Sequence, residues 1–413
     1  MTTEDQSPSP LLITAPTRPV LGPVVTDDDL AAALDALKAE SGPIAVDTER
    51  ASGYRYSQRA YLVQLARRTG PIVLVDPIAF RDLSVVEATF ADDEWILHAA
   101  SQDLPCLREA GIHPGRIFDT EVAGRLLGFE RVSLNAMLER FLEVTLEKGH
   151  SAADWSTRPL PSDWLVYAAL DVDLLVQLRD AVAAELDAAG KREWADQEFT
   201  ATLDAPAPPP RVDPWRRTSG IHALHTRRQL AVVRALWESR DEMASDRDIA
   251  PGRLLPDAAI IAAARTDPSD ANALVKMPVF RGPRQRTHAK RWFAALDGGR
   301  SLADEQLPTT LARIDGMPAP NRWRERNPTA AGRLAAARTA VAELAEAHSV
   351  QAQNLLPADI VRKVCWHAPE PIDIETVSAA LASWGARPWQ VALCAAAMVT
   401  ALQSVPPDDA DLT

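Results

Sequence analysis

The sequence predicts an α/β domain, built on a mixed sheet flanked by helices, that is followed by two small all-α domains. Three observations predict this architecture. Short apolar runs rich in β-branched residues, which are typical of strands, lie between residues 44 and 118. Helical spacing alternates with the later strands, so hairpin-like strands come first and α/β alternation follows. After residue 210, every periodic segment is helical.

The first expected element is a helix that begins after the capping residue Thr26, because Leu30, Leu34 and Leu37 follow at helical spacing. Apolar runs then predict five strands, at Ile44–Val46, Tyr61–Ala66, Ile72–Val75, Trp95–Leu97 and Ile117–Phe118. Apolar periodicity predicts four further helices, at Ser101–Ala110, Thr120–Leu127, Ser133–Leu142 and Ser162–Ala189.

Proline-rich stretches divide the chain into domains. Residues 205–210 read APAPPP, a run that favours polyproline geometry and cannot continue a helix, so it predicts a semi-rigid linker. The expected segments are, in order, a flexible tail at 1–23, the α/β domain at 24–204, a linker at 205–217, a helical domain at 218–298, a linker at 299–328, a second helical domain at 329–404 and an acidic tail at 405–413.

A faint internal repeat supports two tandem helical domains. The tripeptide Leu-Leu-Pro at residues 254–256 recurs 101 residues later, at 355–357, and each copy is followed by an Asp and an apolar helix start. A long amphipathic helix precedes each copy, at Arg227–Met243 and at Ala330–His348. Because the flanking helices match as well, a repeat is favoured over a chance match.

Composition narrows the class of protein. The 413 residues are 46% hydrophobic and 24% charged, which excludes a wholly disordered chain. Three cysteines, Cys106, Cys365 and Cys394, cannot form a disulfide framework, so we expect a reducing compartment. The N-terminus lacks the features of a secretory signal, and no apolar run approaches the ~20 residues of a membrane helix. We therefore expect a cytoplasmic protein with no membrane partner.

The net charge of −13 is unevenly distributed. Residues 1–210 carry a net charge of −16, residues 211–300 carry +7 and residues 301–413 carry −4. An acidic first part beside a basic second part indicates separate roles, although acidic surfaces also confer solubility alone.

Asp47 and Glu49 are the first candidate site residues, at the end of the first predicted strand. Side chains alternate along a strand, so both point to the same face. Adjacent carboxylates repel and raise each other's pKa, and a divalent cation with a preference for hard oxygen ligands, Mg²⁺ or Mn²⁺, relieves that repulsion. A solvated strand end would also explain this pair on its own.

The remaining candidate site residues are Asp103, Tyr167 and Asp171. An apolar strand leads into a helix whose first turn contains Asp103, a position that the helix dipole alone also favours. Tyr167 and Asp171 are four residues apart on one helix face, where a phenol could orient a metal-held water or simply pack inward. His98 is expected to pack or hydrogen-bond beneath the site, and Asp173 to lie on the surface.

Taken together, the stretches VDTE (46–49), HAASQDL (98–104) and YAALD (167–171) resemble the three exonuclease motifs of the DEDD superfamily, in its tyrosine-containing branch. The intervening chain resembles the ribonuclease D family in YLVQLA (61–66), IFDT (117–120) and KGHSAADWSTRPL (148–160), so the resemblance spans Pro43 to Leu186. One departure is Arg50, which stands where the family pattern has an aromatic residue. It bears on contacts at the substrate edge, not on the metal site.

The resemblance implies a ribonuclease-H-like fold and a metal-dependent 3′–5′ exoribonuclease that releases nucleoside 5′-monophosphates. It implies that Asp47, Glu49 and Asp171 hold the metal ion carrying the attacking water. It further implies that Asp47 and Asp103 hold a second ion, Asp103 largely through water, and that Tyr167 orients the nucleophile. Two such ions activate the water and stabilise the leaving oxygen, and they invert the charge that an acidic domain presents to a polyanion.

The helical repeat units resemble HRDC domains, the first more closely than the second. The family implies RNA with a free 3′ end as the substrate, above all tRNA precursors and other structured RNAs. The first unit also holds the densest positive run of the chain, with aromatic residues interleaved, which predicts phosphate contacts and base stacking. A solvated, charge-balanced helix face is the alternative. The basic residues of this run are Arg281, Arg284, Arg286, Lys290 and Arg291, and the aromatic residues are Phe280, Trp292 and Phe293.

Two alternatives to an exoribonuclease stay open at this point. Proofreading DNA exonucleases use the same carboxylates, although no polymerase region follows residue 210. A non-catalytic RNA-binding protein could keep the fold, and it would be favoured if any of the four acids were missing; none is. No GxxxxGK[ST] phosphate loop occurs, which excludes a helicase.

Overall fold

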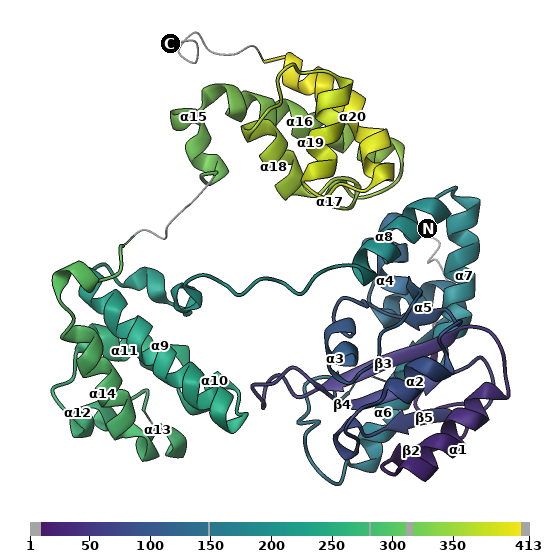
Figure 1. Cartoon of the computed structure of the whole chain (residues 1–413), viewed down its shortest axis with the longest axis horizontal. Helices are drawn as coiled ribbons and strands as arrows, with labels where there is room; N and C mark the ends of the chain where they lie inside the picture. The colour runs from purple at the N-terminus through teal and green to yellow at the C-terminus, as the bar shows by residue number, and fades with distance from the viewer. Residues whose placement is uncertain (1–9, 148, 281, 311–316, 406–413) are drawn as a thin grey trace, which may run out of the picture.

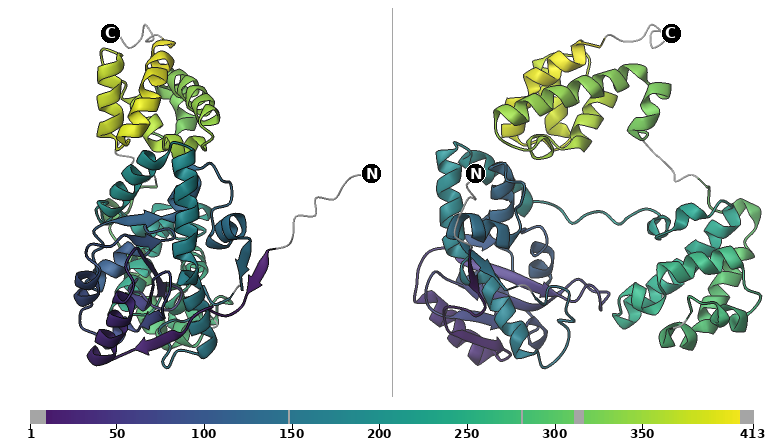
Figure 2. Two further views of the ribbon diagram at one scale, coloured as in Figure 1. Left: turned by 90° about the vertical axis from the view of Figure 1, so that its right-hand side faces the viewer. Right: turned by 180° about the vertical axis from the view of Figure 1, so that it is seen from behind.

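The computed structural model describes residues 10–147, 149–280, 282–310 and 317–405 (Figure 1). An α/β unit comes first, and two helical units follow; the chain between the α/β unit and the first helical unit is extended. Figure 2 shows the same three units from two further sides. The predicted fold class, a mixed sheet flanked by helices and followed by helical domains, is confirmed.

The central sheet has six strands within the described residues, in the spatial order β2-β5-β4-β3-β6-β7. β3, β4 and β5 pair in antiparallel fashion, whereas β2 pairs in parallel with β5, β6 with β3, and β7 with β6. The sheet is therefore mixed. The strands are β2 (Val20–Val24), β3 (Ile44–Arg50), β4 (Ala60–Ala66), β5 (Ile72–Val75), β6 (Trp95–Leu97) and β7 (Ile117–Asp119).

Helices cover the sheet and hold its core together. α6 packs against β3, β4 and β5, while α7 packs against β3 and β6, and α8 against β7. The helices of this unit are α1 (Asp27–Lys38), α2 (Ser84–Thr89), α3 (Leu104–Glu109), α4 (Thr120–Leu126), α5 (Leu134–Leu142), α6 (Ser162–Asp173), α7 (Leu175–Ala188) and α8 (Arg192–Leu203).

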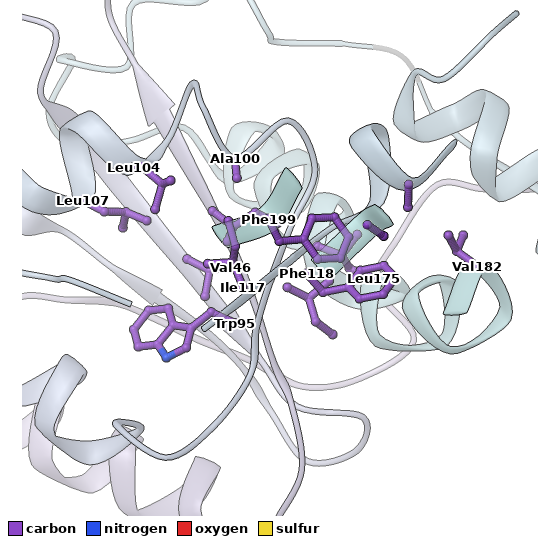
Figure 3. Close-up of a cluster of buried hydrophobic side chains, with 14 of the residues drawn as sticks. Val46, Trp95, Ala100, Leu104, Leu107, Ile117, Phe118, Leu175, Val182 and Phe199 are labelled. Atoms are coloured by element: carbon purple, nitrogen blue, oxygen red, sulfur yellow. The ribbon is translucent and has the colours of Figure 1, made fainter. Parts of the chain in front are cut away.

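Every residue of β4 and β5 is buried, which explains why these strands are continuous apolar runs rather than alternating ones. Figure 3 shows the neighbouring part of the core. There Phe118 of β7 meets Phe199 of α8, with ring centroids 4.9 Å apart, beside Leu175 of α7. The rigid sheet that results carries the candidate site at the end of β3.

The prediction of a flexible N-terminal tail is wrong for residues 10–23, where two strands begin. β1 (Leu11–Ile13) pairs in parallel with β8 (Val144–Leu146), and β2 forms an edge of the main sheet. Pro23 lies within β2, and proline is tolerated there because one side of an edge strand has no ladder to join. Residues 1–9 lie outside the described residues.

Asp173 is buried, with 1% of its surface exposed, so the prediction of a surface position is also wrong. The backbone N–H of Thr17 and Nε of Arg18 each donate a hydrogen bond of 2.8 Å to its carboxylate. The physical reason is that the N-terminal segment crosses this side of α6. The predicted single helix Ser162–Ala189 is interrupted here, because Leu174 leaves helical geometry (φ −109°, ψ 7°) between α6 and α7.

The first helical unit begins earlier than predicted. Trp215 is 2% exposed and belongs to its core, so the expected linker 205–217 ends near Asp213. The elements of this unit are the 3₁₀ turns Pro214–Arg217 and Ile221–Ala223, followed by α9 (Arg227–Arg247), α10 (Pro251–Leu254), α11 (Asp257–Thr266), α12 (Ala271–Lys276), α13 (Pro283–Thr287) and α14 (Ala289–Arg300).

The second helical unit also begins before its predicted start. Trp323 is fully buried against Trp366, with ring centroids 4.9 Å apart, although it lies in the expected linker 299–328. The described elements from residue 301 onward are the 3₁₀ turns Asp304–Gln306 and Pro320–Arg322, followed by α15 (Trp323–Arg326), α16 (Pro328–Ala347), α17 (Ala352–Leu355), α18 (Ala358–Trp366), α19 (Ile374–Ser383) and α20 (Pro388–Gln403). Of the predicted acidic tail, residues 406–413 lie outside the described residues.

The two units repeat the same backbone path around the Leu-Leu-Pro tripeptide. A long helix ends, Asp248 in one unit and Ser349 in the other adopt φ +48°, and a one-turn helix follows. Leu255 (φ −147°, ψ 105°) and Leu356 (φ −145°, ψ 114°) then end that turn in nearly the same conformation. The backbone around the tripeptide therefore repeats in the two units, as the sequence predicts.

Both helical units contact the α/β unit. The loop between β3 and β4 meets the first unit, where Ala250 N donates to Tyr54 O at 2.9 Å and Ser57 N donates to the Asp248 carboxylate at 2.8 Å. On the second unit, Trp389 stacks on Trp194 of α8 with ring centroids 4.7 Å apart. The first unit is thus held beside the end of β3 that carries the candidate site.

Two expectations from composition meet the structure here. No helix among the described residues is long and apolar enough to cross a membrane. Cys106, Cys365 and Cys394 are all free thiols in buried positions.

Candidate active site

β3 supplies the first two carboxylates of the site. Its apolar first half, Ile44–Val46, is fully buried between β4 and β6, and Asp47 and Glu49 follow on one face at the end of the strand. Glu49 is 8% exposed. The strand thus fixes the two side chains in neighbouring positions, as the sequence predicts.

Asp103 reaches the site from the loop between β6 and α3. Asp119 shapes this loop, because its buried carboxylate accepts hydrogen bonds from the backbone N–H groups of Ala99 and Ala100, at 3.1 and 2.7 Å. Ala99 adopts φ +66°, a left-handed conformation that this pair of bonds stabilises. Asp103 is 4% exposed and accepts a 2.6 Å hydrogen bond from the Thr48 hydroxyl.

α6 supplies Tyr167 and Asp171. Its start is anchored by Arg158, whose guanidinium donates to both oxygens of Asp76, at 2.6 and 2.8 Å, and to the carbonyl of Tyr61 at 2.8 Å. α6 packs on β3, and its spacing of four residues aligns Tyr167 with Asp171. Trp155 packs against the ring of Tyr167, with centroids 6.4 Å apart.

Asp47, Glu49 and Asp171 converge, with one carboxylate oxygen from each lying within 4.8 Å of the others. Asp103 stands outside this trio, and its charge still raises the pKa of Asp47, Glu49 and Asp171. The structure therefore brings together all four predicted acids and separates them into a trio and a fourth member.

Burial is the largest cause that raises the pKa of every acid in this group, and repulsion among the carboxylates adds to it in each acid of the trio. The pKa of Asp47 lies well above its usual range, and those of Glu49, Asp171 and Asp103 rise to about 9, about 7 and about 6. Burial and the same negative charges also raise the pKa of the Tyr167 phenol, so it stays protonated at neutral pH.

This donor set fits divalent metal ions. All four donors are hard carboxylate oxygens, the ligand type that Mg²⁺ and Mn²⁺ take. Their mutual repulsion and their burial both favour a bound cation, because a cation restores the ionised form that burial disfavours. The thiol of Cys106 is not part of the donor set, since burial raises its pKa to about 11 and it bonds with Thr48 and the carbonyl of Asp103.

Two cavities flank Tyr167. One, of about 410 Å³, is lined by Asn135, Glu139 and Glu147 together with Tyr167 and Asp171. The other, of about 480 Å³, also shares Glu147 and Tyr167 and reaches His150. The carboxylates therefore adjoin open space on the side of α6 that holds the phenol.

His98 has the supporting role that the sequence predicts. Its Nδ1 lies 2.8 Å from the Thr120 hydroxyl, and burial lowers its pKa to about 4, so the ring is neutral. It thereby fixes the end of β6, from which the loop to Asp103 starts.

The predicted basic run lies on α13 and α14, except Arg281, which is outside the described residues. Arg284, Arg286 and Lys290 are exposed, and Arg291 forms a 2.6 Å ion pair with Glu242. Phe280 and Trp292 are fully buried in the core of the first helical unit, so the prediction that they stack on bases is wrong for these two. Trp292 is buried because it lies on α14, which packs on α9.

Sequence reasoning missed three supporting contacts: the hydroxyl of Thr48 on Asp103, the Asp76 partner of Arg158, and the Arg18 partner of Asp173. Each joins segments that are far apart in the chain, and a local pattern carries no signal for such pairs. Asp119 belongs to a stretch that the resemblance included, although its capping role was not predicted.

Comparison with known families agrees with this geometry. A 3′-5′ exonuclease domain matches residues 23–187, and an HRDC domain matches residues 229–296. The second helical unit, expected to be HRDC-like, instead matches a 3′ to 5′ exonuclease C-terminal domain at residues 316–402. The HRDC prediction is therefore confirmed for the first helical unit, whereas the second unit matches a different family model.

Relatives and solved structures extend the match over most of the chain. Ribonuclease D of Acidiphilium cryptum (strain JF-5) is 32% identical, over 85% of this chain and 88% of its own. A crystal structure of a protein from Bifidobacterium adolescentis, 36% identical, superposes with a TM-score of 0.85 and covers 95% of this chain and 100% of its own. Escherichia coli RNase D, described as an exoribonuclease involved in structured RNA processing, is 25% identical with a TM-score of 0.65, over 94% of this chain and 100% of its own.

The exonuclease match covers the segment that holds all four carboxylates and Tyr167. Ribonuclease D proteins act on RNA, and the DEDD exonuclease fold implies divalent metal ions, which the acidic cluster fits. The chain belongs to the ribonuclease D family and is a 3′–5′ exoribonuclease.

Proposed function

We propose that Asp47, Glu49, Asp103 and Asp171 bind two divalent ions, Mg²⁺ or Mn²⁺, at which the 3′-terminal phosphodiester of RNA is hydrolysed to release nucleoside 5′-monophosphates. The observation that carries this proposal is the convergence of three buried carboxylates within 4.8 Å, with a fourth beside them. So many repelling acids are stable together only when protonated or when bound to cations.

The four acids would bind the two ions in different combinations. Asp47, Glu49 and Asp171 form one ligand set, and Asp103, which stands outside the trio, would join Asp47 at the second ion. When bound, the two ions supply an activated water and stabilise the leaving 3′-oxygen. Thr48 donates a 2.6 Å hydrogen bond to the Asp103 carboxylate and so restricts its orientation.

Tyr167 positions the attacking water. Its raised pKa keeps the hydroxyl protonated, so the phenol donates or accepts a hydrogen bond and does not act as the base. Trp155 packs on the ring of Tyr167 and restricts its position. The two adjoining cavities leave space beside the hydroxyl for solvent and a 3′-terminal nucleotide.

The natural substrates that we propose are tRNA precursors and other structured RNAs with a free 3′ end. The E. coli relative is described as acting in structured RNA processing. In this chain the HRDC unit is basic, with a net charge of +7 over residues 211–300, and it contacts the β3–β4 loop beside the carboxylates. Its exposed Arg284, Arg286 and Lys290 would contact phosphates of the RNA body while the 3′ end enters the site.

We further infer that the protein works in the cytoplasm. Its three cysteines are buried free thiols, which fits a reducing compartment.

The experiment that tests the proposed function is digestion of 3′-labelled RNA and matched DNA with Mg²⁺, with Mn²⁺ and with chelator. We expect mononucleotide release from RNA with either metal and none with chelator. Variants that replace one acid with its isosteric amide, such as Asp47→Asn and Asp171→Asn, should release none at comparable enzyme concentration. Unchanged release by these variants would contradict the assignment.

A further inference from the structure

Arg50 directly follows the carboxylate pair of β3, and the roles assigned above leave it without one. It is partly buried, and its guanidinium donates a 3.3 Å hydrogen bond to the side-chain oxygen of Gln102. Gln102 is the residue before Asp103. Arg50 therefore reaches from the end of one metal-binding segment to the start of another.

The pairing of β3 with β4 is irregular at this point, where β4 contains one extra residue, Tyr61. Glu49 is paired with Leu62 but Arg50 with Ala60, so the register shifts by one residue between them. Bulges redirect side chains, and they occur frequently next to active sites. The positive charge of Arg50 lowers the pKa of Glu49 and of Asp103, against the stronger effect of burial, so it acts on both carboxylates from the rim of the site.

Two other arginines of the α/β unit, Arg158 and Arg55, are already engaged. Arg158 forms a two-point ion pair with Asp76, and Nε of Arg55 donates to the Ser156 hydroxyl at 2.7 Å. Among the described residues, Arg50 donates its side-chain hydrogen bond to Gln102, whose amide is neutral. A guanidinium has five N–H donors, so most of them remain for an incoming group.

The net charge of the site with its ions bound indicates which kind of group Arg50 would bind. Four carboxylates and two divalent ions balance each other, whereas the phosphodiester of RNA arrives with a negative charge that increases as water attacks. A guanidinium at the rim stabilises such charge, and its planar fork matches two phosphate oxygens.

We propose that Arg50 binds RNA through a phosphate at the cleaved linkage or the linkage next to it. This proposal rests on the proposed carboxylate site. It makes Arg50 a substrate-binding residue of this chain that acts through its positive charge.

The test is a double-mutant cycle between Arg50 and the phosphate charge. One partner is Arg50→Gln, and the other is a short 5′-labelled RNA with neutral methylphosphonates at its last two linkages. Affinity is measured by fluorescence anisotropy with Ca²⁺ as the divalent ion, after confirming that no mononucleotide is released. Arg68→Gln is the matched control, because Arg68 is exposed, follows β4 at the opposite end of the β3–β4 ladder and pairs with Asp180.

With all-phosphate RNA, Arg50→Gln should weaken binding roughly 10-fold and reduce the slope of log K against log salt by about 0.7. With methylphosphonate RNA, the same variant should weaken binding less than about 2-fold, because its partner charge is gone. Arg50→Lys should fall between wild type and Arg50→Gln, and Arg68→Gln should match the wild type.

Equal weakening of both RNAs by Arg50→Gln, or no weakening of either, would overturn the proposal. The cycle is run only after the wild-type protein has been shown to release mononucleotides with Mg²⁺ or Mn²⁺. Failure of that release contradicts the proposed carboxylate site, whereas an absent coupling in active protein contradicts the role of Arg50 alone.

Discussion

Thr48 donates a 2.6 Å hydrogen bond to Asp103, and 55 residues separate the two in the chain. Thr48 lies between Asp47 and Glu49, and it faces away from both because side chains alternate along β3. One strand therefore presents two carboxylates to the site and, with the residue between them, orients a third. This contact links the two segments that the proposed metal site has to hold together.

Thr48→Val should lower the turnover number about 10-fold, because Asp103 loses the donor that orients and stabilises its ionised form. Thr48→Ser keeps a hydroxyl and should retain most of the activity. Steady-state hydrolysis of a short RNA at saturating Mg²⁺ checks both variants. Equal activity of Thr48→Val and Thr48→Ser would show that this hydrogen bond does not matter for the reaction.

Tyr167→Phe should lower the turnover number on the order of 10²-fold and leave RNA affinity unchanged, because only the hydroxyl that positions water is lost. Single-turnover rates separate this effect from binding. Tyr167→Leu serves as a second variant that also removes the ring, and it should weaken binding in addition. Full activity of Tyr167→Phe would return the phenol to a packing role.

The stability of the protein in chelator should fall as pH rises. Burial raises the pKa of Glu49 to about 9 and of Asp171 to about 7, whereas in the unfolded chain both carboxyls ionise near pH 4. Between those values the folded protein binds more protons, so its free energy of unfolding decreases with increasing pH. Metal binding to the folded state should oppose this decrease, most strongly at the upper end of the range.

Thermal unfolding between about pH 6 and pH 9, with chelator and with Mg²⁺, measures this effect. The difference in Tm between the two conditions should widen with pH. At the upper end of this pH range, where Asp171 is ionised, Asp171→Asn should unfold at a higher temperature than the wild type in chelator, since one repelling charge is removed. A gap that stays constant or is absent across the range would contradict a metal site built from these acids.

The basic surface of the HRDC unit should matter for structured RNA and not for short oligonucleotides. Reversing Arg284 and Lys290 to Glu should weaken binding of a structured RNA and flatten its salt dependence, because each lost phosphate contact removes about 0.7 from the slope on single-stranded RNA. Hydrolysis of a short RNA should change little. Arg291→Gln is a contrasting variant, since Arg291 is already paired with Glu242. Unchanged affinity for structured RNA in the double variant would remove this surface from the binding site.

The parts of the fold that the sequence could predict are those with a strong local pattern. β4 and β5 are recognisable because both of their faces are buried, so they are continuous apolar runs. The candidate acids are recognisable because their spacing and surroundings resemble those of a known family. Their convergence on one site then follows from where β3, β6 and α6 end or begin.

The parts that could not be predicted depend on distant partners. β1 and β2 are short edge strands in a proline-containing segment, and their partners β8 and β5 are far along the chain. Asp173 is buried only because Arg18 and Thr17 reach it from that segment. Trp292 carries the same local signal whether it stacks on a base or, as here, packs in a core.

Metal stoichiometry tests the central claim most directly. Titration of Mn²⁺ into chelator-treated protein, followed by the electron paramagnetic resonance signal of the free ion, counts the bound ions per chain. The account predicts two bound ions in the wild type, and loss of one in Asp103→Asn with the trio of Asp47, Glu49 and Asp171 intact. Binding of no ion by the wild type, or the same stoichiometry in Asp103→Asn, would contradict it.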